Sequence, residues 1–330
     1  MELYGAVTDD YRDFAAYADG DSPTFADWAR RVAADPQVAA WIAQLPPVKQ
    51  QPNLVFAAAR WHGVPAPGPY DGLREALLGD DGALRETILT RSTQTNEVGR
   101  LATLLPAFGL LAAGRRLALV EIGASAGLNL FPDRWSYAWR TEAGTVVVGP
   151  ESPDAPRLTC DVSGPAPLPD RLPEVAWRRG VDLNPLDVTD DDAMAWLETL
   201  VWPEHDDRRA RLRQAIEVAR SDPPAIVRGD LLEELPALVA QAASYAPDAT
   251  VVVFHSAVIA YLEDADRRRF AALMTQLVED GACHWVSNEG PRVLPEVTGT
   301  TEVPAGRFVM GVDGRPVALT HGHGRSLAWR

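Results

Sequence analysis

Residues 118–130, which read ALVEIGASAGLNL, decide the fold of this 330-residue chain. The first three residues form a short, uniformly apolar run, which is typical of a central parallel strand that is buried on both faces. Glu121 follows at the carboxyl end of this strand, and small residues from Gly123 to Gly127 form the turn toward a helix. Because ligands of open α/β sheets bind beyond the carboxyl ends of the strands, the stretch predicts a ligand site at this turn.

Three interpretations of residues 123–127 are open. In the first, backbone N–H groups of the turn face a nucleoside-type ligand, and Glu121 accepts a hydrogen bond from a ribose hydroxyl. The glycine spacing lacks the G-x-G-x-x-G pattern of a pyrophosphate cradle, which favours a ligand without phosphates. In the second, Gly123, Ser125 and Gly127 satisfy the G-x-S-x-G pattern of a hydrolase nucleophile elbow. In the third, the small residues only let a helix pack closely on the strand.

The nucleophile elbow is disfavoured by its context. An α/β-hydrolase usually builds several strands before its nucleophile, whereas residues 1–113 look helical. A reactive serine also needs a histidine and an acid that the fold places beside it, and no histidine has an obvious role next to Ser125.

The composition and charge exclude several classes of protein. A formal net charge of −15 argues against nucleic acid as the main partner, since binding a phosphate backbone requires clustered cations. Cys160 and Cys283 are too few and too far apart for a disulfide framework or a zinc site, which favours a reducing compartment. The N-terminus is acidic, and no run approaches the roughly 20 apolar residues of a membrane span. We therefore expect a soluble cytoplasmic protein without nucleic-acid or membrane partners.

The chain is expected to have two parts. Residues 1–113 form a helical N-terminal region, in which residues 96–113 make a long apolar helix that Pro106 should bend. From residue 114 strands alternate with helices, which is the signature of a parallel α/β sheet. We expect a domain over residues 114–330, with the helical region as a cap over its site.

Five main strands are expected in this domain. Each ends in polar residues, and after the opening strand they lie at residues 175–181, 225–227, 250–254 and 283–286. A short helix that stops near Pro132 should follow the opening strand. A strand-containing insertion covers about residues 136–173, and Asp313-Gly314 joins two further strands in a hairpin.

Polar residues follow the main strands where each ends: they are Glu121, Asp182, Asp230, His255, Asn288 and Glu289. Because the carboxyl ends of parallel strands share one edge, these side chains should converge on one crevice. Asp and Asn are also common in turns and as helix caps, so each of them alone is compatible with a structural role. Acids after each of the first three strands together favour a ligand site.

These residues carry a resemblance to a known family. Residues 120–127, Asp182 and residues 227–231 (VRGDL) resemble the class I S-adenosylmethionine-dependent methyltransferases, over residues 114–330. The resemblance implies a Rossmann-like, mostly parallel sheet that a C-terminal antiparallel hairpin closes. It also implies S-adenosylmethionine as the cofactor. In that family the glycine loop approaches the amino-acid part of the cofactor, and acids after the second and third strands bind the ribose hydroxyls and the adenine amino group.

The resemblance implies cofactor contacts by the turn and by residues that follow the first three strands: Glu121, Gly123, Ser125, Gly127, Asp182, Asn184, Asp230 and Leu231. Two features depart from the family pattern. Ser125 stands in place of the middle glycine, and the insertion lengthens the span between Gly127 and Asp182.

At full length the chain is similar to an uncharacterised bacterial family, domain of unknown function 2332. The similarity lies in five stretches: residues 93–100 (TQTNEVGR), 121–130, 180–188 (GVDLNPLDV), 201–204 (VWPE) and 254–258 (FHSAV). This similarity supports the fold and implies no particular reaction.

Methyl transfer mainly requires that the acceptor lies in line with the methyl group, and a base helps where the acceptor carries a proton. The candidate base is His255, and Arg100 is the candidate partner of the cofactor carboxylate or of an acidic substrate. Substrate-pocket candidates are the polar residues Gln94, Asn96, Asn288 and Glu289. No metal is expected, because His321 and His323 lack a third ligand nearby.

The sequence therefore favours S-adenosylmethionine-dependent methyl transfer to a small-molecule acceptor. An alternative of a different class is a catalytically idle module that binds a nucleoside ligand as a sensor or partner. A nicotinamide oxidoreductase and a serine hydrolase that uses Ser125 rank lower. The acceptor, the pathway and the oligomeric state do not follow from the sequence.

Overall fold

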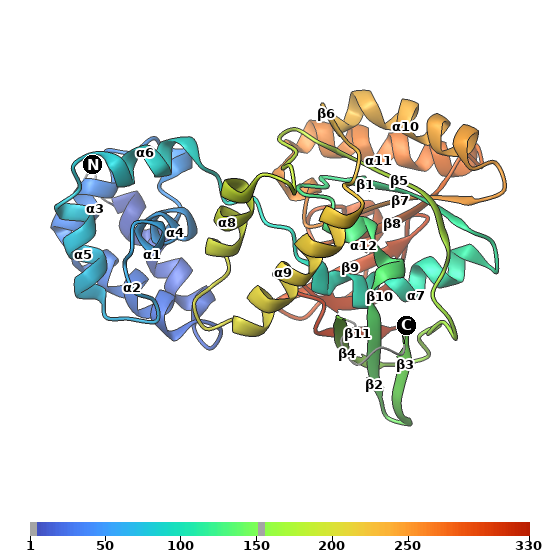
Figure 1. The fold of residues 1–330 in the computed structure, drawn as a ribbon, viewed down its shortest axis with the longest axis horizontal. Coiled ribbons are helices and arrows are strands. Elements are labelled where there is room, and N and C mark those ends of the chain that lie inside the picture. The colour runs from blue at the N-terminus through green and yellow to red at the C-terminus, as the bar shows by residue number, and fades with distance from the viewer. Residues whose placement is uncertain (1–4, 151–155) are drawn as a thin grey trace. The chain divides into compact units, whose positions relative to one another are not determined.

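The computed structural model describes residues 5–150 and 156–330 (Figure 1). The protein is of mixed α/β type and divides into two compact units. The helical unit comprises the residues up to Thr95 together with Asp191–Ala210, and the sheet unit comprises Asn96–Asp190 and Arg211–Arg330. This partition differs from the expected division at residue 113 at two places, because residues 96–113 pack with the sheet and residues 191–210 pack with the N-terminal helices.

The helical unit consists of short helices, of which α2, α3 and α4 begin with a proline. They are α1 (Gly5–Ala18), α2 (Pro23–Ala34), α3 (Pro36–Ile42), η1 (Pro47–Lys49), α4 (Pro52–Trp61), α5 (Tyr70–Leu78), α6 (Ala83–Thr90) and α8 (Asp191–Thr199). Ser22 caps α2 by accepting from the N–H of Phe25, and Asp35 caps α3 in the same way. The core of the unit is aromatic, and Phe25, Trp28 and Phe56 are fully buried in it.

Residues 191–210 complete this core. Trp196 and Leu200 are buried among the N-terminal helices. The Arg60 guanidinium donates to the carbonyl oxygens of Thr199 and Val201, at 2.6 and 2.7 Å. These contacts explain why a segment from the middle of the chain belongs to the N-terminal unit.

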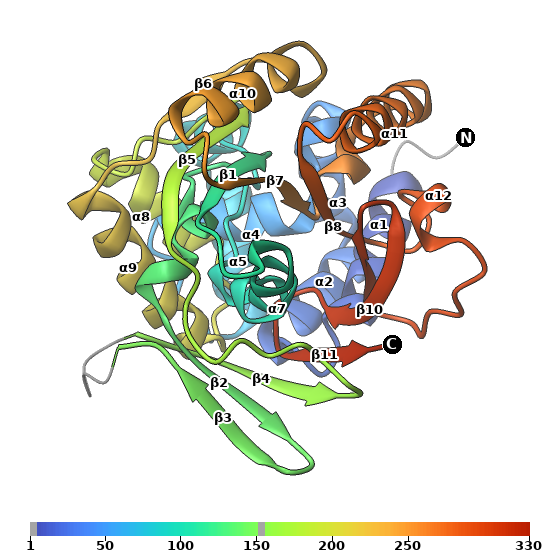
Figure 2. The same ribbon diagram turned by 90° about the vertical axis from the view of Figure 1, so that its right-hand side faces the viewer.

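The sheet unit is built on one eleven-stranded sheet, in the order β3-β2-β4-β11-β10-β9-β8-β7-β1-β5-β6 (Figure 2). Its strands are β1 (Leu117–Ile122), β2 (Ser136–Thr141), β3 (Gly144–Val148), β4 (Arg157–Ser163), β5 (Val175–Asp182), β6 (Ile226–Arg228), β7 (Thr250–Ser256), β8 (His284–Glu289), β9 (Arg307–Val312), β10 (Arg315–His321) and β11 (Ser326–Trp329). Its helices are η2 (Val98–Arg100), α7 (Leu101–Ala112), η3 (Leu128–Leu130), η4 (Pro132–Arg134), α10 (Leu231–Tyr245), η5 (Ile259–Tyr261), α11 (Asp264–Glu279) and α12 (Pro295–Thr298), with α9 (Asp206–Ser221) beginning in residues 191–210.

The strands β6-β5-β1-β7-β8 are parallel throughout and form the centre of the unit. Counted along the chain they stand in the order 3-2-1-4-5, which is that of a doubly wound sheet. Phe270 of α11 contacts His255 on one face of the sheet, whereas Phe108 of α7 packs on Phe254, the preceding residue of β7. The order of strands reverses between β1 and β7, and ligands of such sheets bind beyond the carboxyl ends at this point.

Antiparallel strands extend the sheet beyond β8. The predicted hairpin is confirmed: β9 and β10 pair around Asp313 and Gly314, whose φ angles of 49° and 76° suit a two-residue hairpin turn. The strands of the expected insertion join the same sheet, because β4 pairs with β11 and β2 pairs with β4. β2 was not expected from the sequence.

The helix expected after β1 is replaced by two short 3-10 turns, η3 and η4. Arg178 of β5 holds this segment by donating to the carbonyl oxygen of Leu130 and, through two nitrogens, to Asp133 at 2.9 Å. The same guanidinium lies over the Phe131 ring. This anchoring stabilises tight turns where a short α-helix was predicted.

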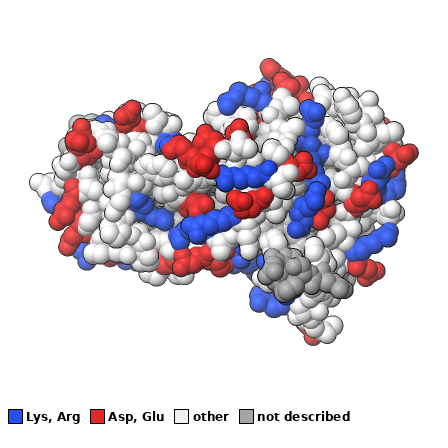
Figure 3. All heavy atoms as spheres, viewed as in Figure 1, with Lys and Arg blue, Asp and Glu red and all other residues white. Residues whose placement is uncertain are grey.

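Charged side chains of both signs are interspersed on the face shown in Figure 3, where arginines alternate with acidic residues. Within the two described ranges, no helix is both long and apolar enough to cross a membrane.

Candidate functional site

The structure brings the three predicted acids to neighbouring strands. Glu121 lies near the end of β1, Asp182 ends β5, and Asp230 follows β6 by two residues. Because β1, β5 and β6 are adjacent and parallel, the three carboxyl groups follow one edge of the sheet, beside the switch point. We call this region the acid edge.

The turn after β1 has a backbone that only small residues tolerate. The φ angles of Gly123, Ser125 and Gly127 are 64°, 55° and 70°. A Cβ atom at Gly123 would lie 1.9 Å from Cγ2 of Val258. The turn is therefore packed tightly against the segment that follows β7.

The backbone N–H groups of this turn bind protein atoms. Those of Gly123 and Ala124 donate to the Val181 carbonyl oxygen, and that of Ser125 donates to the Asp182 carboxylate at 2.8 Å. The expectation that these N–H groups face a ligand is wrong, because β5 supplies their acceptors.

Glu121 is a buried carboxyl group with one hydrogen-bond donor. Its Oε1 accepts from Nδ2 of Asn129 at 3.1 Å, and its buried Oε2 has no partner. Burial raises the pKa of Glu121 to about 8. The hydrogen bond from Asn129 and the charge of Arg100 oppose this rise, and the charge of Asp182 adds to it. At neutral pH the carboxyl group is therefore mostly protonated.

Two neighbours of Glu121 in sequence also carry buried polar atoms without a partner. They are Oγ of Ser125 and Oδ1 of Asn129, on side chains of residues that are 2% and 4% exposed. Native proteins leave few such atoms unsatisfied, and each calls for an explanation. Asn129 was not among the predicted site residues, although it lies within the stretch that predicted the site.

Asp182 and Asp230 also accept hydrogen bonds from backbone N–H groups. Asp182 accepts from the N–H groups of Ser125 and Asn184, and Asp230 caps α10 by accepting from the N–H of Leu232 at 2.8 Å. Asp182 is half-buried and Asp230 is exposed, so solvent reaches both carboxylates.

Asn184 and Leu231 have structural contacts. Oδ1 of Asn184 accepts from the Arg228 guanidinium. Leu231 begins α10 and packs against the hydrophobic core of the sheet unit.

His255 is the clearest correction to the predicted site. It is fully buried, and Nε1 of Trp285 donates to its Nε2 at 3.0 Å. An indole nitrogen only donates, so the imidazole proton is on Nδ1, which donates to Oε1 of Glu289 at 2.8 Å. Both ring nitrogens are occupied, and His255 is a satisfied core histidine rather than a base.

Glu289 and Asn288 form hydrogen bonds with the end of β7 and with the segment that follows it. Oε1 of Glu289 also accepts from the N–H groups of Val258 and Ile259. Asn288 donates to Oγ of Ser256 and accepts from Thr320. The structure gives these two predicted pocket residues a scaffolding role.

Arg100 and Asn96 tie the segment before α7 to the carboxyl edge. Arg100 donates to the carbonyl oxygens of Ser256 and Gly322, both at 2.8 Å. Oδ1 of Asn96 accepts from the N–H of Leu128 at 2.9 Å. Both residues therefore lie beside the acid edge, at the switch point.

Gln94 belongs to the helical unit, just before the boundary at Thr95. Two histidines that sequence reasoning set aside, His321 and His323, lie in the sheet unit. β10 runs parallel to β8 because both pair antiparallel with β9. Its final residue, His321, therefore shares the edge, and His323 lies 3.4 Å from Glu97.

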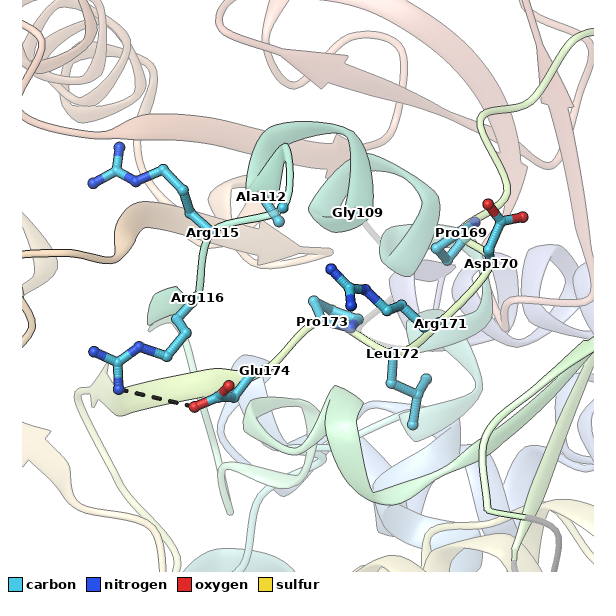
Figure 4. Close-up of a pocket in the computed structure, with 11 residues that line it drawn as sticks. Gly109, Ala112, Arg115, Arg116, Pro169, Asp170, Arg171, Leu172, Pro173 and Glu174 are labelled. Carbon is cyan, nitrogen blue, oxygen red and sulfur yellow. Dashed lines mark ion pairs between the residues drawn. The ribbon is translucent and has the colours of Figure 1, made fainter.

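A cavity of about 610 Å³ opens at the opposite edge of the sheet, next to the amino ends of β1 and β5 (Figure 4). Arg115, Arg116 and Arg171 line it, and all three are exposed. Arg116 faces Glu174 at 3.8 Å, and Arg115 donates to backbone carbonyl oxygens. None of the predicted site residues lines this cavity.

Fold and site together define an α/β protein with a doubly wound parallel centre and an acid edge at its switch point. The sequence model of the family described as "Uncharacterized protein conserved in bacteria (DUF2332)" matches residues 8–329, and the chain belongs to this family. No curated protein matches the chain.

Proposed function

We propose that the protein binds S-adenosylmethionine at the acid edge and transfers its methyl group to a small-molecule acceptor. The observation that supports this is the placement of Glu121, Asp182 and Asp230 at the ends of three adjacent parallel strands beside the switch point. Carboxylates accept hydrogen bonds from hydroxyl and amino groups, which the nucleoside half of this cofactor carries. Phosphates, which the carboxylates would repel, are absent from it.

The chain's own residues fit such a ligand at defined places. Asp182 and Asp230 are reachable from solvent and would accept from the ribose hydroxyls and the adenine amino group. The small residues of the turn would let the ligand approach β1 closely. When bound, the cofactor supplies an electrophilic methyl group. The task left to the protein is to hold an acceptor in line with it.

The occupied ring nitrogens of His255 favour a second candidate, a catalytically idle module that binds the same nucleoside ligand. His255 was the only base predicted for the acceptor proton, and Trp285 and Glu289 use both its nitrogens. Under the methyltransferase proposal, the acceptor is either nucleophilic without deprotonation or loses its proton to another group.

Calorimetric titration with S-adenosylmethionine and S-adenosylhomocysteine tests the proposal. The informative variant is Asp230→Asn, because an asparagine still caps α10 while the negative charge is lost. A hydrogen bond to a charged group contributes about 1.5–3 kcal/mol. We therefore expect micromolar binding to weaken roughly tenfold or more. Asp264→Asn, at the exposed start of α11, is the matched control and should bind like the wild type.

Three outcomes separate the candidates. Binding that Asp230→Asn weakens, followed by methylation of any member of a small-molecule panel, supports the transferase. The same binding without turnover across the panel supports the idle module. A folded protein that binds neither ligand contradicts both.

A further inference from the structure

We propose that the cavity at the amino edge of the sheet binds a small organic phosphate, and that Arg171 contacts its phosphate group. The cavity belongs to the sheet unit and lies next to the residues that precede β1 and β5, at the other ends of these strands from the acid edge (Figure 4). The inference does not depend on the proposed function, since the ligand proposed for the acid edge carries no phosphate.

The walls of the cavity are held in place by the fold. They come from the end of α7, from the loop that leads into β1 and from the loop that leads into β5. The two loops are joined where the N–H of Leu117 donates to the carbonyl oxygen of Glu174 at 2.8 Å. A Cβ atom on Gly109 would lie 3.1 Å from Cβ of Pro169, so the second loop packs closely on α7. The lining residues are therefore fixed relative to one another by the amino ends of the strands.

The cavity has more positive than negative charge, in a chain whose net charge is −15. Arg115, Arg116 and Arg171 line it together with the acids Asp170 and Glu174. Glu174 faces Arg116 at 3.8 Å, so these two charges offset one another. Asp170 points away from the guanidinium group of Arg171 in Figure 4. The charges of Arg115 and Arg171 remain, and they favour an anionic ligand.

Arg171 is the arginine that is available to a ligand. Its side chain is exposed, and no residue of 5–150 or 156–330 forms a hydrogen bond or an ion pair with it. Figure 4 shows that it points toward the end of α7 and the loop before β1. Arg115, in contrast, donates to the carbonyl oxygens of Asp248 and Ala249, so it acts on a ligand through its charge. A guanidinium group presents paired N–H donors that match the oxygens of a phosphate.

The end of α7 is compatible with an anion in the cavity. The carboxyl end of a helix carries a partial negative charge on its unpaired carbonyl groups. The carbonyl oxygens of Gly109 and Ala112, the two residues of α7 that line the cavity, accept from the N–H groups of Ala113 and Arg115. These hydrogen bonds reduce the repulsion that the helix end would exert on the ligand.

The size and the remaining lining favour an organic anion over an inorganic one. The volume of about 610 Å³ lies within the range of roughly 300–1,000 Å³ that is typical of small-molecule sites. Leu172, Pro169 and Pro173 supply apolar surface beside the arginines. We therefore expect the phosphate group to lie at Arg171 and an apolar body to pack against these three residues.

The experiment is calorimetric titration of the full chain with phenyl phosphate at pH 8 in Tris. Phosphate monoesters have a second pKa of about 6, so this probe is a dianion with an apolar ring. Inorganic phosphate lacks the ring, and benzoate has the ring with a single negative charge. Burial of the ring and the second charge each favour phenyl phosphate, and we expect the two comparison probes to bind roughly tenfold more weakly or worse.

Arg171→Ala is the decisive variant. A hydrogen bond to a charged group is strong enough that its loss should weaken phenyl phosphate binding roughly tenfold or more. Because none of the described residues pairs with Arg171, the substitution should leave thermal unfolding unchanged. Arg268→Ala is the matched control: Arg268 is an exposed arginine of α11 that likewise has no partner among the described residues. It should bind phenyl phosphate like the wild type.

Each outcome decides the inference. Saturable binding of phenyl phosphate that Arg171→Ala weakens and Arg268→Ala does not supports it. Absence of binding, or binding that Arg171→Ala leaves unchanged, overturns it. Displacement of phenyl phosphate by S-adenosylhomocysteine would place the anion at the acid edge and also overturn it. Equal binding of benzoate or inorganic phosphate contradicts the assignment to an organic phosphate. None of these results depends on methyl transfer.

Discussion

The carboxyl edge of the parallel strands has two halves that look alike in sequence and differ in their hydrogen bonds. Each half has a buried glutamate near a strand end, Glu121 on β1 and Glu289 on β8. Oε2 of both lacks a partner, but Oε1 of Glu289 accepts from His255, Val258 and Ile259, whereas Oε1 of Glu121 accepts from Asn129 alone. A glutamate near a strand end can therefore have either a structural role or a place in a binding site. The number of hydrogen bonds that its carboxyl group accepts distinguishes the two.

The largest effect is expected in the satisfied half. Glu289→Ala leaves the His255 Nδ1–H and the N–H groups of Val258 and Ile259 without their acceptor. We expect the free energy of unfolding to fall by about 3–5 kcal/mol in urea denaturation. The exposed control Glu279→Ala should change it by less than about 0.5 kcal/mol. A loss below about 1 kcal/mol at position 289 would remove the distinction between the halves.

In the half that contains Glu121, the free energy of unfolding should depend on pH. The pKa of Glu121 is about 8 in the folded chain, against a model value of 4.5, so the folded state holds this proton more tightly. The stability that this proton provides is fully present below about pH 4.5 and is lost as pH rises through 8.

Relative to Glu121→Gln, the wild type should lose up to about 1.4 kcal/mol of unfolding free energy per pH unit between these limits. Urea denaturation of both proteins at pH 5, 6, 7 and 8 measures this difference. A difference that stays constant with pH would show that Glu121 is ionised throughout.

The smallest difference between a variant and its control is expected at the turn after β1, which packs against the segment after β7. Gly123→Ala places a side chain at a φ of 64° and brings its Cβ 1.9 Å from Cγ2 of Val258. Gly281→Ala is the matched control, since its φ is 69° and nothing lies within 4 Å of its Cβ. The left-handed φ costs roughly 1–2 kcal/mol in both variants.

The contact with Val258 should lower the free energy of unfolding of Gly123→Ala by about 1–3 kcal/mol more than that of Gly281→Ala. Gly123→Ala should also lose S-adenosylmethionine binding. Thermal unfolding measures the first effect, and calorimetric titration of the two variants measures the second. Equal stability of Gly123→Ala and Gly281→Ala would mean that the segment after β7 moves away from the new side chain at little cost in free energy.

Local sequence patterns were enough to predict the parallel centre of the sheet. β1, β7 and β8 lie where short apolar runs were found, because strands buried on both faces carry a nearly continuous apolar sequence. β5 was also predicted, although it carries Arg178 and Arg179 and is only partly buried. The acids at their ends followed from the same runs. The place of β2 and β4 in this sheet was not predictable, since β2 pairs with β4 and β4 pairs with β11, more than 150 residues farther along the chain, and such distant pairing has no local signature.

The role of His255 was also beyond local reasoning. His255 was expected just beyond the end of its strand, whereas it lies within β7, so its side chain faces one side of the sheet and not the crevice at the strand end. The donor that occupies Nε2 of His255 is Trp285, thirty positions away. Asn129 was missed for a related reason, because a helix was expected where η3 instead turns its side chain toward Glu121.

The composition of the helical unit has a consequence for how the protein is made. Arg60 finds its acceptors at Thr199 and Val201, and the aromatic core takes in Trp196. A ribosome that adds about 5–20 residues per second needs on the order of ten seconds to proceed from residue 95 to residue 210. Throughout that interval the nascent N-terminal helices lack part of their core. The core of the helical unit is thus completed only after residues 96–190 of the sheet unit have been synthesised, and until then chaperones can bind its exposed apolar surface.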